Sequence, residues 1–343
     1  MRLLLLAVLL LSACSPSPED VPDTPTPPAE SWTVVEQGLP GALLSVWGNG
    51  SGDVWLCGAD PADGKGPLVL HGSGDDLTRL ETGATGDLWW VFGPREGEVW
   101  LVGVKGLILR YDRVKKSFTS VPAVTDATLF GLWGPPEGPL YTVGGHIYPA
   151  KGPGVIVRID GDVATLVTDL PAGVDATAAF FKVWGSATDD VWVIGERGTV
   201  LHFDGATWTH APLPGKPRLV TVHGSSKDDM AVVGGASQAV VFERHGGDWT
   251  DASPPEIPGL NGVFVTPTGD AYAVGMSGTA LTRRAGSWRS LPDAPVGKDW
   301  HAVWVDERGD AWVVGGDLMT AGAMIDGAVL RYGPKHDASG GMP

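Results

Sequence analysis

The sequence contains only two cysteines in 343 residues, Cys14 and Cys57. Cys14 directly follows the N-terminal leader and is expected to be acylated, so Cys57 has no partner for an intramolecular disulfide and the folded part depends on its core alone. The eight histidines are scattered, without the i, i+4 or cysteine-rich spacing of zinc motifs. We therefore expect no metal site and no cofactor, and we name no catalytic residue.

Positive charge is scarce as well. Lys and Arg number 24 against 40 Asp and Glu, which gives a formal net charge of −16. Nucleic acids and anionic lipid surfaces are themselves negative, so this balance argues against either as a partner through a basic face. Beyond the first residues no apolar run is long enough to cross a membrane, and no window shows sustained helical periodicity.

The N-terminus has the form of a secretory leader over residues 1–13. Arg2 precedes an apolar run that is too short for a permanent membrane span. The segment Leu11–Cys14, LSAC, resembles the lipobox of bacterial lipoproteins, which implies cleavage before Cys14 and its acylation, with palmitate for example. Each buried CH₂ group of such chains contributes about 0.8 kcal/mol to anchoring in the lipid bilayer. Ser15 favours the outer membrane, and the alternative is an ordinary secretory signal with an incidental cysteine.

Residues 14–30 are rich in proline and acidic residues and poor in apolar ones. Such a segment cannot bury enough surface to fold, so we expect an extended, lipid-anchored tether here. The folded domain is expected over residues 31–333, followed by a disordered tail over residues 334–343.

The rest of the chain consists of one unit that occurs seven times. Most copies begin with an aromatic residue followed by glycine, have an acidic residue six positions later and a second aromatic two further on, and close on a glycine. By subtraction of their positions, the closing glycines are 39 to 51 residues apart. They are Gly58, Gly103, Gly144, Gly195, Gly234, Gly275 and Gly315.

One copy, residues 182–210, has the pattern of four short strands, with Asp204-Gly205 as a hairpin turn. Four-stranded units at this spacing are typical of a β-propeller. The last copy has a third strand, Ala328–Tyr332, but no fourth, whereas Ser31–Val35 has the form of a fourth strand without a third. We therefore predict an all-β, seven-bladed β-propeller in which the N-terminal strand completes the last blade and hides both free edges.

These units resemble those of bacterial repeat-type β-propeller lipoproteins over nearly all of the mature domain, which implies the same fold and an anchored location. The segment Phe203–Trp208, FDGATW, is also similar to the Asp-box of sialidase-type propellers. That second resemblance is partial, because the equivalent turns His245–Trp249 and Arg284–Trp288 lack the Asp-Gly pair.

Residues shared by most copies serve what every blade needs, which is packing and turn geometry. We interpret two tryptophan columns as core between blades, where an aromatic side chain buries about 150–250 Å². They are Trp47, Trp133, Trp184 and Trp304, and Trp55, Trp100, Trp192 and Trp312. The acidic column is interpreted as accepting backbone N–H bonds in the turn before the second strand. Its members are Asp53, Glu98, Asp190, Asp229, Asp270 and Asp310.

Two further columns are expected to be structural. Cys57 aligns with Val and Ile in the other copies, so we expect it to be buried and unreactive. Basic residues recur in the third strand and are expected to pair with neighbouring carboxylates, the alternative being an anion site. They are His71, Arg110, Arg158, His202 and Arg331.

Departures from the repeat are better candidates for a site. Residues 59–66, 145–154 and 316–327 form long connections between second and third strands, on the face where loops of propellers usually carry recognition. In the column of the first strand that faces the channel, Lys182 is the only charge and Trp90 the only large ring. We expect a binding site at this channel mouth, and its candidate residues are Asp87, Trp90, Lys182, Arg218, Asp299 and His301, with His146, Tyr148 and Lys151 from one long connection.

The leading functional hypothesis is a non-enzymatic binding or assembly scaffold for an envelope protein or glycan. A glycan hydrolase of the Asp-box type is an alternative, but it needs paired carboxylates or a tyrosine nucleophile with its partner. Sialidase-like enzymes also use three arginines, whereas the expected channel mouth offers one, Arg218, and no candidate tyrosine nucleophile. A calcium-stabilised adhesin or pilus-associated propeller is a third hypothesis. For this the loop Gly58–Gly66 offers two aspartates without the regular oxygen spacing of a calcium loop.

Overall fold

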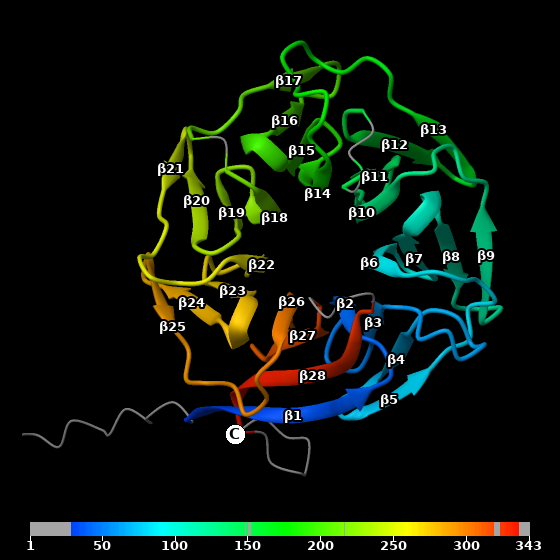
Figure 1. The fold of residues 1–343 in the computed structure, drawn as a ribbon, viewed down its shortest axis with the longest axis vertical. Helices are drawn as coiled ribbons and strands as arrows, with labels where there is room; N and C mark the ends of the chain where they lie inside the picture. The colour runs from blue at the N-terminus through cyan, green and yellow to red at the C-terminus, as the bar shows by residue number, and fades with distance from the viewer. Residues whose placement is uncertain (1–28, 148, 150–151, 216, 319–322, 336–343) are drawn as a thin grey trace, which may run out of the picture.

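The computed structural model describes residues 29–147, 149, 152–215, 217–318 and 323–335. In this part of the chain, 28 strands form seven four-stranded antiparallel sheets that stand as blades in a ring (Figure 1). The predicted all-β, seven-bladed β-propeller is therefore confirmed. Cys14, Tyr148 and Lys151 lie outside the described residues, as do the leader, most of the tether and most of the tail.

Each blade contains four strands in chain order from the channel outward, except that the last blade ends on β1. Blades 1 to 3 consist of β2 (Leu43–Gly48), β3 (Val54–Gly58), β4 (Val69–Ser73) and β5 (Asp76–Arg79); β6 (Leu88–Arg95), β7 (Glu98–Gly103), β8 (Ile108–Asp112) and β9 (Ser117–Val121); and β10 (Thr128–Trp133), β11 (Leu140–Gly145), β12 (Val155–Asp160) and β13 (Val163–Leu166). Blades 4 and 5 consist of β14 (Phe180–Ala187), β15 (Asp190–Gly195), β16 (Val200–Phe203) and β17 (Trp208–His210); and β18 (Leu219–Ser226), β19 (Asp229–Gly235), β20 (Ala239–His245) and β21 (Trp249–Asp251). Blades 6 and 7 consist of β22 (Leu260–Val265), β23 (Ala271–Gly275), β24 (Ala280–Arg284) and β25 (Ser287–Ser290); and β26 (Asp299–Val305), β27 (Ala311–Asp317), β28 (Ile325–Pro334) and β1 (Glu30–Leu39). Three single turns of 3-10 helix, η1 (Val104–Gly106), η2 (Glu196–Gly198) and η3 (Met276–Gly278), connect second and third strands.

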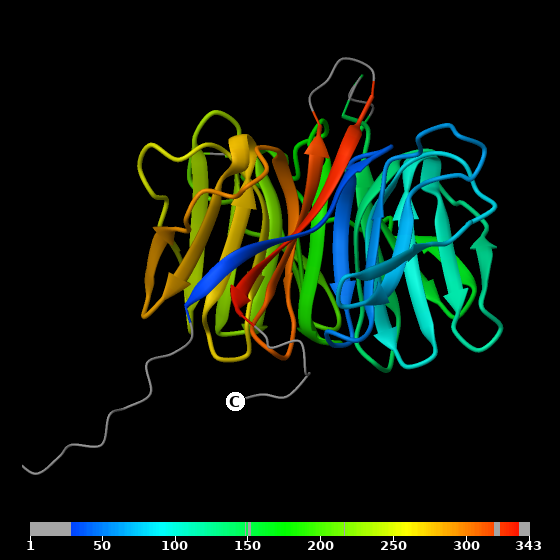
Figure 2. The ribbon, with the colours of Figure 1, turned by 90° about the horizontal axis from the view of Figure 1, so that it is seen from below.

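The N-terminal strand closes the ring. β1 pairs antiparallel with β28, with Glu30 opposite Pro334 and Leu39 opposite Gly327. Because β1 lies far from β28 in the sequence, this pairing joins the two ends of the domain in one sheet and covers the outer edge of β28. Figure 2 shows the two strands crossing the outer side of blade 7 together.

Burial falls from the channel outward. The second strand of each blade is almost fully buried, as in β3, whereas outer strands such as β5 alternate between exposed and half-buried residues. Both faces of a second strand pack on neighbouring blades, which explains its continuous apolar sequence. Cys57, in β3, is fully buried, and burial raises the pKa of its thiol far above the ordinary value.

The Trp-Gly pair at the end of the first strand is explained by contacts between blades. The Trp47 ring of blade 1 lies against Gly93 of blade 2, where a Cβ atom would overlap with the indole. The same contact recurs between three other pairs of neighbouring blades: Trp133 with Gly185, Trp184 with Gly224, and Trp304 of the last blade with Gly48 of the first. The glycine therefore makes room for the tryptophan of the preceding blade.

Blades 6 and 7 have valine in place of this glycine, and the contact changes accordingly. Blade 5 has His223 at the position of these tryptophans, and its Nδ1 accepts the N–H of Val265 in blade 6 at 3.1 Å. His223 also stacks on Phe264, with ring centroids 4.3 Å apart. Trp47, Trp133, Trp184 and Trp304 thus each meet a glycine, whereas His223 meets Val265.

The acidic column binds side chains rather than the backbone amides that we expected. Asp53 Oδ1 accepts Trp55 Nε1 at 3.0 Å and lies 2.9 Å from His71 Nε2, and the Trp55 and His71 rings stack at 4.0 Å. Asp190 binds Trp192 and His202 in the same way, at 2.9 Å each. Burial raises the pKa of Asp53, but hydrogen bonds from Arg113, His71 and Trp55 outweigh it and hold the pKa below its ordinary value.

The basic side chains of the third strand pair with carboxylates. The pairs are His71 with Asp53, Arg110 with Asp162, Arg158 with Asp160, His202 with Asp190, and Arg331 with Asp75 and Asp310. Asp270 acts through its backbone carbonyl, which accepts the N–H of Thr266 at 2.7 Å. These columns therefore form contacts within and between blades.

We predict that Gly93→Ala destabilises the fold by about 1–3 kcal/mol, because the new methyl group overlaps with the Trp47 ring in a packed interior. Chemical denaturation monitored by circular dichroism measures this. Gly52→Ala is the matched control, since no atom lies within 4 Å of a Cβ placed there. If the overlap is the cause, Gly93→Ala costs much less in a Trp47→Ala background, and an equal cost in both backgrounds contradicts the assignment.

Candidate functional site at the channel mouth

Every blade has a β-bulge in its first strand. In each pairing of first and second strands the register skips one residue near the start of the first strand. A bulge leaves one residue outside the ladder and re-aims its side chain. The seven skipped residues are Leu44, Trp89, Phe130, Phe181, Val220, Asn261 and His301, and we call them the bulge ring.

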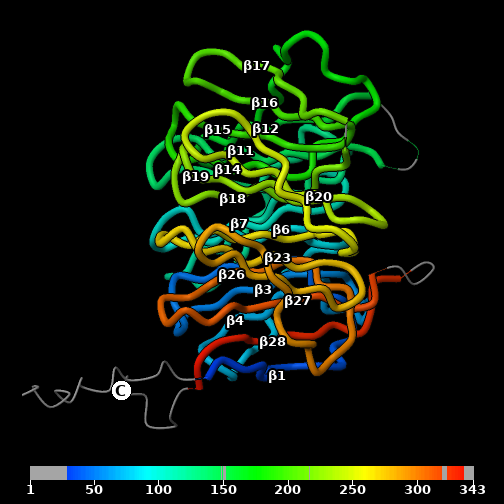
Figure 3. The backbone as a smooth tube through the Cα atoms, turned by 90° about the vertical axis from the view of Figure 1, so that its left-hand side faces the viewer, coloured from blue at the N-terminus to red at the C-terminus, as the bar shows by residue number. Residues whose placement is uncertain are grey.

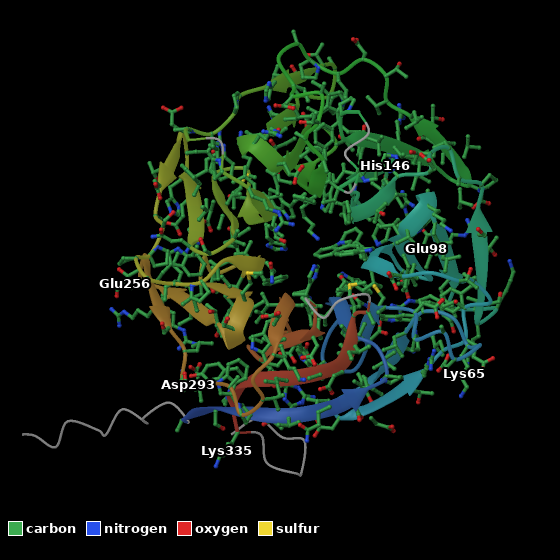
Figure 4. All side chains as sticks on the ribbon, in the orientation of Figure 1. Lys65, Glu98, His146, Glu256, Asp293 and Lys335 are labelled. Atoms are coloured by element: carbon green, nitrogen blue, oxygen red, sulfur yellow. The ribbon has the colours of Figure 1, made fainter. Side chains whose placement is uncertain are left out.

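All seven residues of the bulge ring line one pocket at a mouth of the central channel. The volume of this pocket is about 150 Å³. Connections between second and third strands complete its rim, with Ile147 from blade 3, Met276 from blade 6, and Leu318 and Met324 from blade 7. The connections that lead into the first strands and those between second and third strands thus share this face, as expected. Figure 4 shows side chains from all blades directed toward the centre of the ring, with His146 labelled beside blade 3.

The pocket has an apolar side and a polar side. Blades 2 to 4 contribute Trp89, Phe130 and Phe181, which meet edge to face with centroids 5.0 and 5.4 Å apart. Blades 5 to 7 contribute four of the five polar lining side chains, Arg218, Asn261, Asp299 and His301, and the fifth is Lys182 from blade 4. The arrangement suits a ligand with an apolar part and a polar group.

Lys182 lies at the floor of the pocket and is only 3% exposed. Its side chain runs sideways over Gly131 of the neighbouring blade, where a Cβ would lie 3.1 Å from Lys182 Cδ. Its Nζ donates to the carbonyl oxygen of Phe130 at 3.1 Å and lies 3.6 Å from the centroid of the Trp90 ring. Burial lowers the pKa of Lys182 to about 7. No carboxylate among the described residues forms an ion pair with Lys182 that would offset this effect.

His301 is neutral at physiological pH. Burial, and then the positive charges of Lys182 and Arg218, lower its pKa to about 3. Its Nδ1 lies 2.5 Å from the carbonyl oxygen of Leu44, which can only accept, so Nδ1 carries the proton and Nε2 is an acceptor. No hydrogen bond to Nε2 is found within the described residues.

Arg218 and Asp299 lie at the rim. The Arg218 guanidinium stacks over Phe181 at 5.0 Å and is exposed, and within the described residues it has no ion pair. Asp299 accepts the N–H of Ser277 at 2.8 Å through Oδ1. Arg218 is therefore a cation at the rim with no carboxylate partner in this part of the chain.

The structure brings together four of the predicted candidates, Lys182, Arg218, Asp299 and His301. Trp90 lies beneath the pocket, where Lys182 covers its ring and where it helps line a second hollow at the other end of the channel. Asp87 faces a separate hollow between blades 7 and 1 and accepts the N–H of Asp60 at 2.8 Å.

Two of the three long connections lie side by side, as we expected for neighbouring blades. Those of blades 7 and 1 meet, since residues of both line the hollow that contains Asp87, and Ala42 donates its N–H to the carbonyl of Met324 at 3.1 Å. His146 in blade 3 lies 3.2 Å from Asp126 and does not line the pocket, although its neighbour Ile147 does.

The aromatic wall was not predicted from the sequence. Trp89, Phe130 and Phe181 occupy the column immediately before the one that we assigned to the channel. The internal alignment contained a signal for it, since this column holds Leu44, Trp89, Phe130, Phe181, Val220, Asn261 and His301. It varies more in chemistry than the packing columns do, as a recognition surface should.

The described residues contain no group of three or more His, Cys, Asp or Glu side chains that could hold a metal ion. Within the same residues, no helix has the length and hydropathy needed to span a bilayer.

No protein-family model and no curated protein matches the sequence. Solved structures are similar in fold. Streptogramin B lyase has a TM-score of 0.72 at 10% identity and covers 89% of this chain and 98% of its own. The WD40 β-propeller domain of Doa1 has a TM-score of 0.65 at 10% identity, over 90% and 98%. YCF48 from Cyanidioschyzon merolae has a TM-score of 0.65 at 13% identity, over 88% and 98%. At such identities the similarity shows the propeller fold alone.

We predict that Lys182→Met changes how stability depends on pH. The pKa of Lys182 is about 7 in the folded chain against an ordinary value of 10.5, so between these pH values the unfolded chain binds more protons and wild-type stability rises with pH. Methionine does not titrate. From pH 7 to pH 10 the stability difference should therefore shift toward the wild type by on the order of 1–4 kcal/mol, measured by denaturant unfolding.

Lys65→Met is the matched control, because Lys65 is exposed, and it should show no such trend. A difference between wild type and Lys182→Met that stays constant over the same pH range contradicts a desolvated Lys182.

Proposed function

We propose that this protein is a lipid-anchored protein of the cell envelope whose propeller binds a ligand at the channel mouth without catalysing a reaction. The observation that carries the binding role is the convergence of all seven bulge residues on one pocket. A repeat protein needs only packing from its repeated columns, so a column of varied chemistry that faces a cavity is best explained by recognition.

The position of the N-terminus supports an anchored scaffold. Glu30 pairs with Pro334 at the end of β28, whereas β28 starts at Ile325, beside the pocket residue Met324. The described chain therefore begins on the face opposite to the pocket, as Figures 2 and 3 show for β1 and β28. A tether attached at Glu30 leaves the pocket turned away from the membrane.

A non-enzymatic role is supported by the chemistry of the pocket. Glycoside hydrolysis needs two carboxylates, or a tyrosine with an acid–base partner. Among the described lining residues, Asp299 is the one carboxylate and none is a tyrosine. In the segment similar to an Asp-box, Asp204 accepts the backbone N–H groups of Ala206 and Thr207 at 2.9 and 2.7 Å, which is a turn-forming role.

The anchor is tested by Cys14→Ser. We expect the wild type to incorporate a palmitate label and to sediment with membranes, and the variant to lose both while remaining folded, because acyl chains supply the membrane affinity. Cys57→Ser controls for loss of a thiol as such. Membrane association that persists in Cys14→Ser without label contradicts lipid anchoring.

The binding face is tested by site-specific photo-crosslinking in intact cells. A benzoylphenylalanine at Ile147 or Met276, on the pocket rim, should give discrete adducts with envelope components. The same probe at Glu96, in the β6–β7 turn on the other face, should give none. Adducts of equal yield from both faces, or from neither, contradict a recognition face at the channel mouth.

A further inference from the structure

We infer that the channel-mouth pocket takes a small organic anion, a carboxylate attached to one apolar group about the size of a single aromatic ring. This inference rests on the proposed binding function of the same pocket and names its ligand class.

The charge of the ligand follows from the unpaired cations. In a chain with a net charge of −16, most basic side chains have a carboxylate within 4 Å, Arg79, Arg113 and Arg283 among them. Arg218 is different, because within the described residues it forms no ion pair and its guanidinium lies over the Phe181 ring. Lys182 adds a second basic group below it, without a carboxylate. A planar guanidinium with free donors at the edge of an apolar cavity is the side chain best suited to bind a carboxylate.

The hydrogen-bonding groups agree with this orientation. Trp89 Nε1 is buried and, among the described residues, has no hydrogen-bond partner. The Nδ2 of Asn261 is already engaged with the carbonyl oxygen of Trp300 at 2.9 Å. Lys182 Nζ is likewise engaged, with the carbonyl oxygen of Phe130 and the Trp90 ring, so Arg218 is the main donor for the oxygens of an anion.

The apolar part of the ligand follows from the wall and the volume. Trp89, Phe130 and Phe181 form a continuous edge-to-face surface, and such rings pack well against another ring. The cavity of about 150 Å³ is close to the volume of an engineered cavity that binds benzene. A longer apolar chain would extend past the rim, so one ring or a group of equal size fills the enclosed part.

Other ligand classes leave groups unsatisfied. A cation would find one carboxylate, Asp299, but would also meet Arg218 and Lys182, whose basic groups oppose it. A neutral sugar could lie against the aromatic wall, but it would leave the guanidinium without a counter-charge. A large polyanion would meet the net negative surface of the molecule. A compact apolar anion avoids all three penalties.

The test uses calorimetric titration of the purified full chain with three isosteric probes. We expect 3-phenylpropionate to bind about tenfold more tightly than 3-phenylpropionamide, because a charge-assisted hydrogen bond is lost in the amide, and 3-phenylpropylamine not to bind. In Arg218→Gln the preference for the carboxylate over the amide should fall to about threefold or less. Arg197→Gln is the matched control, because Arg197 is an exposed arginine of η2 that pairs with Asp175. It should keep the wild-type preference.

Thermal melting of each variant checks that the fold is intact. Equal affinity for carboxylate and amide, tighter binding of the amine, or an unchanged preference in Arg218→Gln overturns the assigned ligand class. Binding of none of the three probes also overturns it, whereas face-specific crosslinking in cells would then still stand. Failure of the ligand class and failure of the binding face are thus separate results.

Discussion

The contact on which the rest of the structure depends is an indole ring lying on a glycine of the next blade. It occurs between blades 1 and 2, 3 and 4, and 4 and 5, and it joins blade 7 back to blade 1 through Trp304 and Gly48. Protein interiors are close-packed, so a contact that tolerates no added methyl group also fixes the angle between blades. Together with the pairing of β1 and β28, it makes the ring rigid.

A rigid ring allows the bulge positions to vary. The skipped residue of each first strand has no partner in the ladder with the second strand, and its side chain lines a shared pocket. Strand pairing therefore does not dictate its identity, although Leu44, Phe130 and Phe181 are also buried. The bulge ring accordingly holds aliphatic, aromatic, amide and imidazole side chains, while the column directly after it is mostly small and buried. The residue after the bulge thus packs in the blade, while the bulge residue itself can vary in chemistry.

The number of blades and the strand order could be predicted because each is a sum of seven similar signals, set by local strand and turn chemistry. The closing strand could be predicted because the last copy lacks a fourth strand and Ser31–Val35 has the form of one. The bulges could not, because all copies share them and the spacing within the repeat does not change. Missing them placed the site one residue too late and made Trp90 a candidate in place of Trp89. Asp87 lies away from the pocket for a similar reason: its side chain binds the Asp60 amide in a neighbouring connection, a contact between blades that no periodicity reports.

Departure from a repeat is therefore a signal for function only when the chain itself does not compensate for it. Lys182 and Trp90 are both exceptions in one column, and they lie on each other across Gly131, so most of their irregularity is satisfied internally. Arg218 is also an exception, yet the described chain offers its charge only the face of a phenyl ring. A buried basic group with internal partners chiefly fills the channel. A rim cation that lacks a counter-charge can still form a charge-assisted hydrogen bond with a ligand. This difference in compensation, more than rarity in the alignment, is the physical reason to assign recognition to Arg218 and the aromatic wall beside it.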